Sequence, residues 1–304
     1  MLYNSANGSE LGQVKDIPVV YVHYGNIPGY LKRSLQNATK YNKTVVLITE
    51  INFKFDSVKC FSIKKYTKDV DVFESVYEHL STNSKEFEKI CIARWFVLRN
   101  FMEEQKIDVC YYADSDVMIY DDLSKVYDSY REYDAAFNIS ESQENYRWAA
   151  SASCSYWKLD TINKFCDFIL NAYKSDKKEL MEEKWAYHVK NKVAGGVCDM
   201  TLLYLFSKEI NYRSLSKAKN HTAFDHNMFD SSNYYKDEYE MEHTKIGGAL
   251  LKKIEWINGQ PYGFNKITGE KVRFAVLTEY AKTFSDEKEA LSSRIRNKIK
   301  AYIK

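Results

Sequence analysis

Short, nearly continuous apolar runs alternate with helix-like patterns along the N-terminal part of the chain. The runs are rich in β-branched and aromatic residues and cover residues 17–24, 44–49 and 109–113. Apolar side chains recur at helical spacing between these runs, over residues 30–38 and most clearly over 86–105. Runs without polar alternation indicate strands that are covered on both faces. The order of strand, helix and strand therefore predicts an α/β fold with a mostly parallel sheet.

Weaker patterns continue this arrangement further along the chain. Strands are expected at residues 58–63, 117–120, 134–139 and 152–157, and helices at 70–81, at 160–174 and from about Asp199 onward. Beyond residue 210 the pattern is irregular. There, Tyr262–Phe264 and Ile267–Glu270 indicate turns between short strands, and residues 272–277 form the last expected strand.

Composition and charge are those of one globular unit. Of the 304 residues, 45% are hydrophobic and 28% are charged, so the chain can bury a large core. The sequence has 3 prolines and 11 glycines, and no Pro-rich or Gly/Ser-rich linker divides it. The formal net charge is +2, with basic and acidic residues interspersed, which argues against a nucleic-acid partner. One continuous domain is the expectation.

Cysteine usage and hydropathy predict a cytoplasmic protein. The six cysteines show no C-x-x-C motif and no paired spacing, so they are expected to be reduced thiols rather than a disulfide framework or a zinc site. The first sixteen residues are polar and predict no signal peptide. No run of eighteen apolar residues predicts a membrane span.

Two aspartates follow the strand predicted at 109–113. In an open α/β sheet, ligands bind beyond the carboxyl ends of the strands, which is where Asp114 and Asp116 fall. Carboxylates two residues apart around a turn can share Mg²⁺ or Mn²⁺, whose other positions are filled by water and phosphate oxygens. We therefore expect Asp114 and Asp116 to bind a metal ion that holds a diphosphate.

Three other interpretations of the aspartate pair are weaker. A calcium loop of the EF-hand type needs a glycine at its sixth position and a glutamate at its twelfth, and both are missing here. A phosphotransferase that forms an aspartyl phosphate also carries two such aspartates. However, its pair normally follows the first strand, and Met118 stands where Thr or Val is typical. A bare pair can also be a solvated turn.

The region around this turn resembles the GT-A glycosyltransferases, in the style of bacterial polysaccharide transferases and, more distantly, glycogenin. The likeness is carried by Ala93-Arg94-Trp95-Phe96-Val97-Leu98 and, about fifteen residues later, by Tyr112-Ala113-Asp114-Ser115-Asp116-Val117. It covers residues 17–277 in the order of elements, with specific motifs in the central third. It implies a metal-dependent enzyme that moves a sugar from a nucleotide diphosphate, expected to be a UDP-sugar, to a surface glycan or a lipid-linked acceptor.

The resemblance also implies the domain organisation. A single GT-A catalytic domain is expected at residues 1–285, with a central mixed, mostly parallel sheet flanked by helices. Residues 17–125 would form its nucleotide-binding half and residues 126–285 its acceptor half. Residues 286–304 form a basic amphipathic pattern. This helix would either lie on the inner face of an anionic membrane or pack on the domain with a solvated basic rim.

Several residues are implied to bind the donor. Arg94 would reach the diphosphate or the sugar, since a guanidinium suits phosphate; the alternative is a surface arginine paired with Glu88 or Glu104. Tyr24 would stack on uracil and Gly25 would allow close backbone approach, unless this segment is a plain strand-to-helix turn. Ser115 belongs to the same donor-binding set. Glu50, after the second strand, is a candidate for the base or ribose.

A second motif, Gly195-Gly196-Val197-Cys198-Asp199, resembles the Gly-rich loop of these enzymes. Asp199 would face the donor sugar and the acceptor, as a base in an inverting enzyme or as a positioning group in a retaining one. Its alternative role is the N-cap of the following helix, and the two roles are compatible.

The C-terminal motif departs from the family. Many relatives carry a histidine there as a further metal ligand, followed by a lysine on the diphosphate, whereas this sequence reads Val276-Leu277-Thr278-Glu279-Tyr280-Ala281-Lys282. Glu279 or Thr278 would replace the histidine, or His243 would come from elsewhere, or the ligand is absent. Lys282 still fits the diphosphate role. The missing histidine also keeps open a non-catalytic module that binds nucleotide sugars.

A last candidate is the segment around His221 and Phe224–Asn227. It could border the acceptor site, although a loop with a structural role is the default. No third ligand stands at helical spacing to make a zinc site, and no nucleophile elbow is present.

Overall fold

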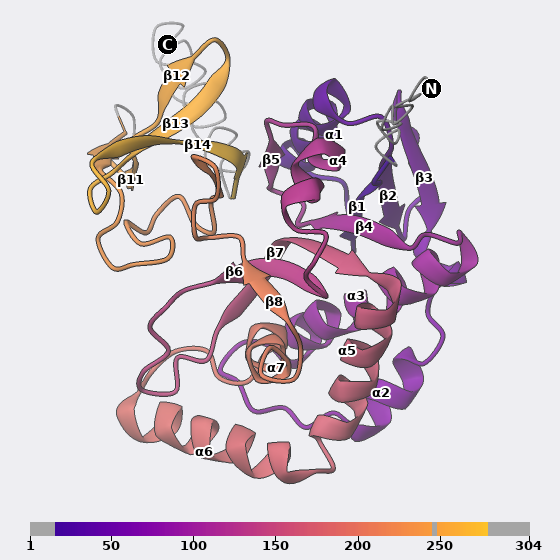
Figure 1. Ribbon diagram of the computed structural model, residues 1–304. Coiled ribbons are helices and arrows are strands. Elements are labelled where there is room, and N and C mark those ends of the chain that lie inside the picture. Colours follow the sequence, from indigo (N-terminus) through magenta and orange to yellow (C-terminus); the bar gives the residue numbers. More distant parts are fainter. Residues whose placement is uncertain (1–15, 245–247, 279–304) are drawn as a thin grey trace, which may run out of the picture.

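A seven-stranded sheet forms the centre of the molecule (Figure 1). The computed structural model describes residues 16–244 and 248–278. The strands of this sheet are β1 (Val19–His23), β2 (Val45–Thr49), β3 (Val58–Ser62), β4 (Val109–Ala113), β6 (Ala135–Ile139), β7 (Ala150–Lys158) and β8 (Tyr212–Ser214). They lie in the order β3-β2-β1-β4-β7-β6-β8, and β7 runs against its two neighbours while the other pairs are parallel. The α/β architecture with a mostly parallel central sheet is confirmed.

Alternate residues of each strand are buried on opposite faces of this sheet. Alternate residues of β1, such as Val20 and Val22, pack into one cluster, and Val19 and Tyr21 pack into another on the opposite face. The strands β1, β2 and β4 are therefore buried almost throughout, as their continuous apolar runs predicted.

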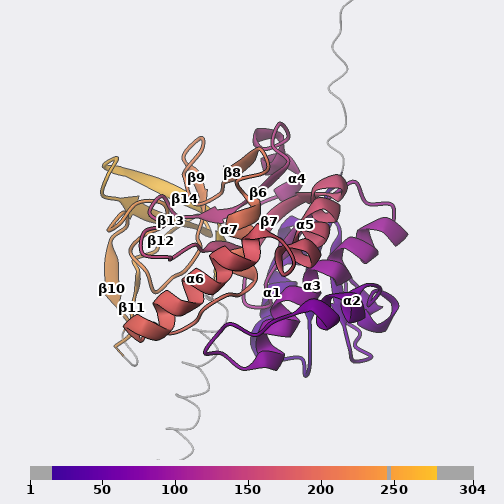
Figure 2. The same ribbon diagram turned by 90° about the horizontal axis from the view of Figure 1, so that it is seen from below.

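Helices cover one face of the sheet and share the other with a second sheet (Figures 1 and 2). The helices are α1 (Gly29–Tyr41), α2 (Val70–Val76), α3 (Lys85–Glu104), α4 (Leu123–Val126), α5 (Leu159–Ala172), α6 (Asp176–Asn191) and α7 (Asp199–Phe206). Short 3-10 turns lie at Ile63–Lys65 and Tyr127–Ser129. Side chains of α3, α5 and α7 fill the cluster on one face, and those of α1 and α4 contribute to the other.

A smaller sheet stands beside the carboxyl end of β4. It contains β12 (Glu255–Ile257), β13 (Gln260–Asn265), β14 (Glu270–Leu277) and β5 (Met118–Ile119), and β9 (Thr222–Phe224) pairs with β14 in parallel. A hairpin of β10 (Met241–His243) and β11 (Leu250–Lys252) lies next to it. Because β5 follows the aspartate turn directly, the chain crosses from the large sheet to the small one at that turn.

Two expected elements differ from the structure. Residues 262–264 lie inside β13 rather than in a turn. Gly263 serves close packing there, since a Cβ on it would lie 2.7 Å from the Phe274 ring and 2.9 Å from Tyr239. The helix expected at 70–81 ends at Val76, because the chain then runs extended towards Gly196, with which Ser81 forms a bridge.

The helix α6 was not predicted. Its buried side chains are Met181, Lys184 and His188, two of which are polar, so its sequence lacks an apolar stripe. The turn expected at 267–270 is present between β13 and β14. Each of the six cysteines has a free thiol. Within the described ranges, the helices are too short or too polar to span a membrane.

Candidate functional site

The aspartate turn closes the carboxyl end of β4. The backbone N–H of Asp114 donates to the carbonyl of Ser153 at 2.7 Å, and the N–H of Val117 donates to the carbonyl of Asp114 at 3.1 Å. The first bond holds the turn against β7, and the second closes the turn itself. Asp114 and Asp116 both line a cavity of about 350 Å³. The pair thus lies where the sequence placed it, beyond the end of a central strand.

The cavity lies where the two sheets meet, and most of its lining residues are polar, with Ile139, Ala149 and Met200 as the apolar ones. The large sheet and the loop after β6 contribute Asn138, Ser140, Arg147, Ser151 and Ser153. The segment after β9 and the end of β14 contribute His226, Asn227, Asp230 and Thr278. Carboxylate, amide, hydroxyl and guanidinium groups therefore surround a space of the size that a small polar ligand needs.

Arg94 on α3 joins two carboxylates that are distant in the sequence. Its Nη1 donates to Asp114 Oδ1 at 2.6 Å, and its Nη2 donates to Asp199 Oδ2 at 2.5 Å. The Tyr112 hydroxyl also donates to Asp114 Oδ1, at 2.6 Å. Burial alone would lower the pKa of Arg94, but the two carboxylates outweigh it and raise the pKa above its ordinary value. Arg94 is therefore a permanent cation within the site.

The alternative role of Arg94 as a surface partner of glutamates on its own helix is wrong. Glu88 accepts hydrogen bonds from Ser81 and Asn83, and Glu104 accepts one from the Tyr66 hydroxyl. The side chain of Arg94 is only 15% exposed, because it packs over the rings of Trp95 and Tyr112.

The aspartate turn suits a hard divalent cation. Asp114 Oδ1 is occupied by Arg94 and Tyr112, and Asp114 Oδ2 takes part in neither contact. Within the described part of the chain, no three His, Cys, Asp or Glu side chains gather closely enough to enclose a metal ion. A pair of carboxylates with an open side is what Mg²⁺ or Mn²⁺ uses when water and phosphate oxygens supply its other ligands.

Asp199 is the first residue of α7, and its side chain contacts Arg94 rather than the helix end. Cys198 occupies the N-cap position, and no side-chain cap is formed there. The N-cap interpretation of Asp199 is therefore wrong. The carboxylate is 7% exposed and lies next to the cavity-lining Met200.

The Gly-rich loop before α7 is bound to the segment before α3. Val197 N–H donates to the carbonyl of Leu80 at 2.8 Å, and Thr82 N–H donates to that of Gly195 at 3.0 Å. A Cβ on Gly196 would lie 2.2 Å from the Leu80 carbonyl oxygen, so only glycine fits this close approach. This contact sets the position of Asp199.

The end of β1 gathers the residues expected to bind a nucleotide. Gly25, with φ of +80°, donates its N–H to Glu50 Oε2 at 2.7 Å. His23 Nε2 lies 2.8 Å from the carbonyl of Asn26 and so carries the proton, which leaves Nδ1 to accept from the Ser115 hydroxyl at 2.8 Å. Burial and the charge of Glu50 raise the pKa of Tyr24, against the effect of Arg94.

A smaller cavity, of about 230 Å³, adjoins this edge. It is lined by Glu50, Ile51, Asn52, Phe53, Cys60, Phe61, Ser62 and Lys64, at the ends of β2 and β3. Tyr24, Gly25, Glu50 and Ser115 are thus brought to one side of the aspartate turn.

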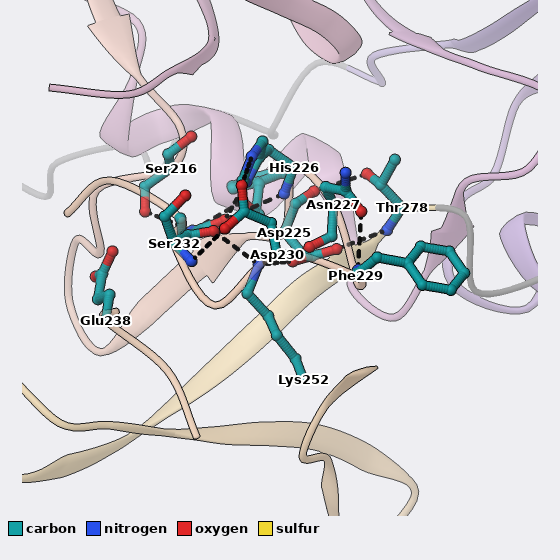
Figure 3. A network of polar contacts seen from close by, with 12 residues as sticks. Ser216, Asp225, His226, Asn227, Phe229, Asp230, Ser232, Glu238, Lys252 and Thr278 are labelled. Atoms are coloured by element: carbon teal, nitrogen blue, oxygen red, sulfur yellow. Dashed lines mark hydrogen bonds and ion pairs between the residues drawn. The ribbon is translucent and has the colours of Figure 1, made fainter. Parts of the chain in front are cut away.

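The segment after β9, which the sequence indicated to be a loop, carries residues that line the cavity. His226 and Asp230 line the main cavity, and a fully buried ion pair between Asp225 and Lys252 lies behind them (Figure 3). Burial and the charge of Lys252 lower the pKa of His226. His221 lies elsewhere, with a side chain 74% exposed. In the sequence, the run Asp225–His226–Asn227 was the feature that marked this segment. The sequence alone does not show which residues these side chains contact.

Of the remaining predicted residues that the structure describes, His243 does not line the cavity. His243 is exposed on β10 and contacts the carbonyl of Gly248. Glu279, Lys282 and the expected helix at 286–304 lie outside the described residues. Thr278, by contrast, lines the cavity, and its hydroxyl donates to the carbonyl of Asp225 at 2.7 Å.

Three solved structures resemble this fold at a distance. Mouse xyloside xylosyltransferase 1 in its apo form matches with 10% identity and a TM-score of 0.42, over 66% of this chain and 85% of that one. The glycosyltransferase GlyE of Streptococcus pneumoniae TIGR4 matches with 13% identity and a TM-score of 0.36, over 66% of this chain and 45% of that one. HddC from Yersinia pseudotuberculosis matches with 10% identity and a TM-score of 0.29, over 49% of this chain and 79% of that one.

No protein-family model and no curated protein matches the sequence. This chain spans less than half of the GlyE chain. The function proposed below rests on the geometry of the site.

Proposed function

We propose that this protein is a glycosyltransferase that moves a sugar from a nucleotide diphosphate donor, a UDP-sugar, to a hydroxyl group of a glycan or glycolipid. The observation that carries the proposal is the pair Asp114 and Asp116 at the carboxyl end of β4. Both side chains line a polar cavity between two sheets. Carboxylates in that place suit a cation shared with a diphosphate, and the rest of the cavity has room for a sugar.

Asp114 and Asp116 are the proposed ligands of Mn²⁺ or Mg²⁺. When bound, such an ion acts as a Lewis acid on the leaving diphosphate. Arg94 and Tyr112 both bind Asp114 through Oδ1, and Oδ2 takes part in neither contact. This preorganisation keeps the carboxylate in position without the donor.

Tyr24, Gly25, Glu50 and Ser115 are the proposed nucleotide side of the site. Gly25 and Glu50 are already joined by a hydrogen bond, and Ser115 is tied to β1 through His23. The half-buried ring of Tyr24 offers a face to a base, and the carboxylate of Glu50 can accept from a base or a ribose.

Arg94 and Asp199 are the proposed polar groups next to the reacting bond. Within the described residues, Arg94 Nε is buried and has no hydrogen-bond partner. Its guanidinium charge lies beside Asp114, where it would stabilise the diphosphate of a bound donor. Asp199 is bonded to Arg94, and this ion pair favours a positioning role over proton abstraction.

The C-terminal part of the proposal concerns residues outside the described ranges. Glu279 is proposed as a further metal ligand and Lys282 as a contact to the diphosphate. The basic residues of 286–304 are proposed to hold a cytoplasmic enzyme at an anionic membrane surface, close to a lipid-linked acceptor.

A thermal-shift experiment tests the proposal. We expect the melting temperature to rise with UDP and Mn²⁺ together by roughly 5 °C at about 100 times Kd, and little with either alone. Asp116→Asn should abolish the rise because it removes a charged ligand. Asp176→Asn, on a side chain that is 80% exposed on α6, is the matched control and should keep it.

Two results would contradict the proposal. One is the absence of any metal-linked stabilisation by UDP or UDP-sugars in the wild-type protein. The other is binding of beryllofluoride to Asp114, which would favour the aspartyl-phosphate chemistry instead. Transfer or hydrolysis of a UDP-sugar would exclude the non-catalytic module.

A further inference from the structure

Asn233 fixes the hydrogen-bonding state of the cavity-lining His226. The amide of Asn233 is fully buried, and its Nδ2 donates to the carbonyls of Ser216 at 2.6 Å and Phe224 at 3.2 Å. Its Oδ1 accepts the backbone N–H of His226 at 3.1 Å. With both donor hydrogens used and the oxygen already accepting, the amide has one possible orientation.

The imidazole of His226 must therefore donate to Asn233. Its Nδ1 lies 3.3 Å from Asn233 Oδ1, and two lone pairs would repel each other at that distance, so Nδ1 carries the proton. In the neutral ring this leaves Nε2 as a hydrogen-bond acceptor. The side chain is 16% exposed and lines the cavity.

Asp230 places a second acceptor beside that nitrogen. Its Oδ1 accepts the backbone N–H of Ser232 at 2.9 Å. Its Oδ2 lies 4.0 Å from His226 Nε2. That distance is too long for a hydrogen bond, and an ionised carboxylate has no proton to offer. Two acceptors thus lie 4.0 Å apart at the cavity wall, and they are not hydrogen-bonded to each other.

A buried cation makes this arrangement rigid. Lys252 Nζ donates to Asp225 Oδ1 at 2.7 Å and to the carbonyls of Asn227 at 2.8 Å and Ser232 at 3.1 Å. These three bonds hold the chain on both sides of His226 and Asp230 (Figure 3). The two acceptors are therefore preorganised and do not depend on a ligand for their position.

We propose that His226 Nε2 and Asp230 Oδ2 form a subsite that accepts hydrogen bonds from two neighbouring hydroxyl groups of a sugar. A diol supplies two donors at short separation, which is what two adjacent acceptors without protons require. The inference rests on the proposed function and deepens it, because the sugar is either that of the nucleotide donor or the terminal residue of the acceptor.

Four variants test the subsite. Asp230→Asn turns one acceptor into an amide whose N–H can donate to His226 Nε2, so the pair closes on itself. His226→Phe removes the ring acceptor, and His226→Gln restores an oxygen near the place of Nε2. His221→Phe, an exposed position outside the cavity, is the matched control. Urea unfolding of each variant shows that it is folded.

Calorimetry with Mn²⁺ separates the two possible sugars. If the donor sugar occupies the subsite, Asp230→Asn and His226→Phe lower the affinity for UDP-glucose or UDP-galactose by about tenfold and leave the affinity for UDP unchanged. If the acceptor occupies the subsite, the same variants lower the affinity for methyl glucoside or methyl galactoside by that factor in the presence of UDP. In either case His226→Gln recovers most of the affinity, and His221→Phe matches the wild type.

Three outcomes overturn the subsite. The first is that the folded variants bind every sugar probe with the affinity of the wild type. The second is that they lose affinity for UDP and for the UDP-sugar equally, and the third is that His226→Gln binds the sugar as weakly as His226→Phe. If the wild type binds no UDP compound at all, the proposed function fails by itself. Saturation-transfer NMR with free glucose and galactose then tests the subsite alone, and the lack of a signal that depends on His226 and Asp230 rejects it.

Discussion

Arg94 shows how single residues of the site obtain their roles from distant partners. It lies 20 positions from Asp114 and 105 from Asp199 in the sequence, and its guanidinium bonds to both. A planar group with several fixed donors can bridge two carboxylates, whereas an ammonium group cannot do so with the same geometry. The charge of Arg94 also offsets the repulsion that the two acids would otherwise exert on each other.

Lys184 on α6 is another buried lysine, and unlike Lys252 it lacks a carboxylate partner in the described structure. Its Nζ donates to the carbonyls of Arg147 and Trp148 and to the Thr201 hydroxyl. It therefore holds the loop that brings Arg147 to the cavity. Burial lowers its pKa to about 8, below the value of an exposed lysine.

This lowered pKa predicts a pH dependence of stability. Between about pH 8 and the ordinary lysine pKa near 10.4, the unfolded chain binds a proton at this site that the folded chain has released. The free energy of unfolding of the wild type should therefore rise relative to that of Lys184→Met as the pH increases from 8. The slope is at most about 1.4 kcal/mol per pH unit.

Urea unfolding at pH 7, 8 and 9 measures this difference, and the comparison with Lys184→Met cancels the other titrating groups. A difference that stays constant over this range, or falls, would show that Lys184 keeps its proton on folding.

At the scale of elements, the site depends on backbone hydrogen bonds between two loops. The loop before α7 pairs with the segment before α3 through the bridge between Ser81 and Gly196. Gly196 has φ of +153° and no room for a Cβ. Its neighbour Gly195 has φ of +87°, but a Cβ there would meet open space. Both glycines thus adopt backbone conformations that other residues rarely take, and Gly196 in addition has no space for a side chain.

Alanine substitutions at these glycines should separate backbone strain from collision. Gly195→Ala should lower the free energy of unfolding by about 1 kcal/mol, the cost of a left-handed conformation. Gly196→Ala should cost about 3 kcal/mol because backbone atoms must move apart. Urea unfolding gives both values, and similar losses at the two positions would show that the contact with Leu80 yields easily.

Fold prediction from the sequence succeeded where local pattern decides an element. The strand at 109–113 and the long helix before it were predicted almost to the residue, because apolar side chains fill the strand and recur at helical spacing along the buried face of the helix. The helix α6 was missed because its few buried positions are largely polar. Residues 262–264 were misread because a glycine that serves close packing looks the same in sequence as one that serves a turn.

At the scale of the whole molecule, the cavity belongs to neither sheet alone. The chain leaves β4 through the aspartate turn and enters β5, where Met118 pairs with Leu277 of the smaller sheet. One wall therefore comes from the large sheet and the other from residues after β9 and at the end of β14. A ligand in the cavity touches both.

This arrangement predicts the pattern of protection by a ligand. Binding of UDP with Mn²⁺ should slow amide hydrogen exchange at residues 109–119 and also at 222–232 and 274–278. The reason is that a ligand bound at the aspartate turn would also stabilise the small sheet, which is joined to that turn through β5. Hydrogen-exchange mass spectrometry with and without the ligand tests this, and Asp116→Asn serves as the unliganded control. Protection confined to residues 17–119 would show that the two sheets respond independently.

The sequence by itself determined the strands β1, β2 and β4, the helices that cover them and the place of Asp114 and Asp116. These features depend on apolar periodicity and on chain neighbours, which short-range physics controls. Tertiary structure alone decided that Arg94 joins Asp114 to Asp199, and that His226 and Asp230 face the same cavity. Those contacts depend on strand order and on how the second sheet closes against the first, and the residues that meet there lie too far apart in the chain for any local pattern to pair them.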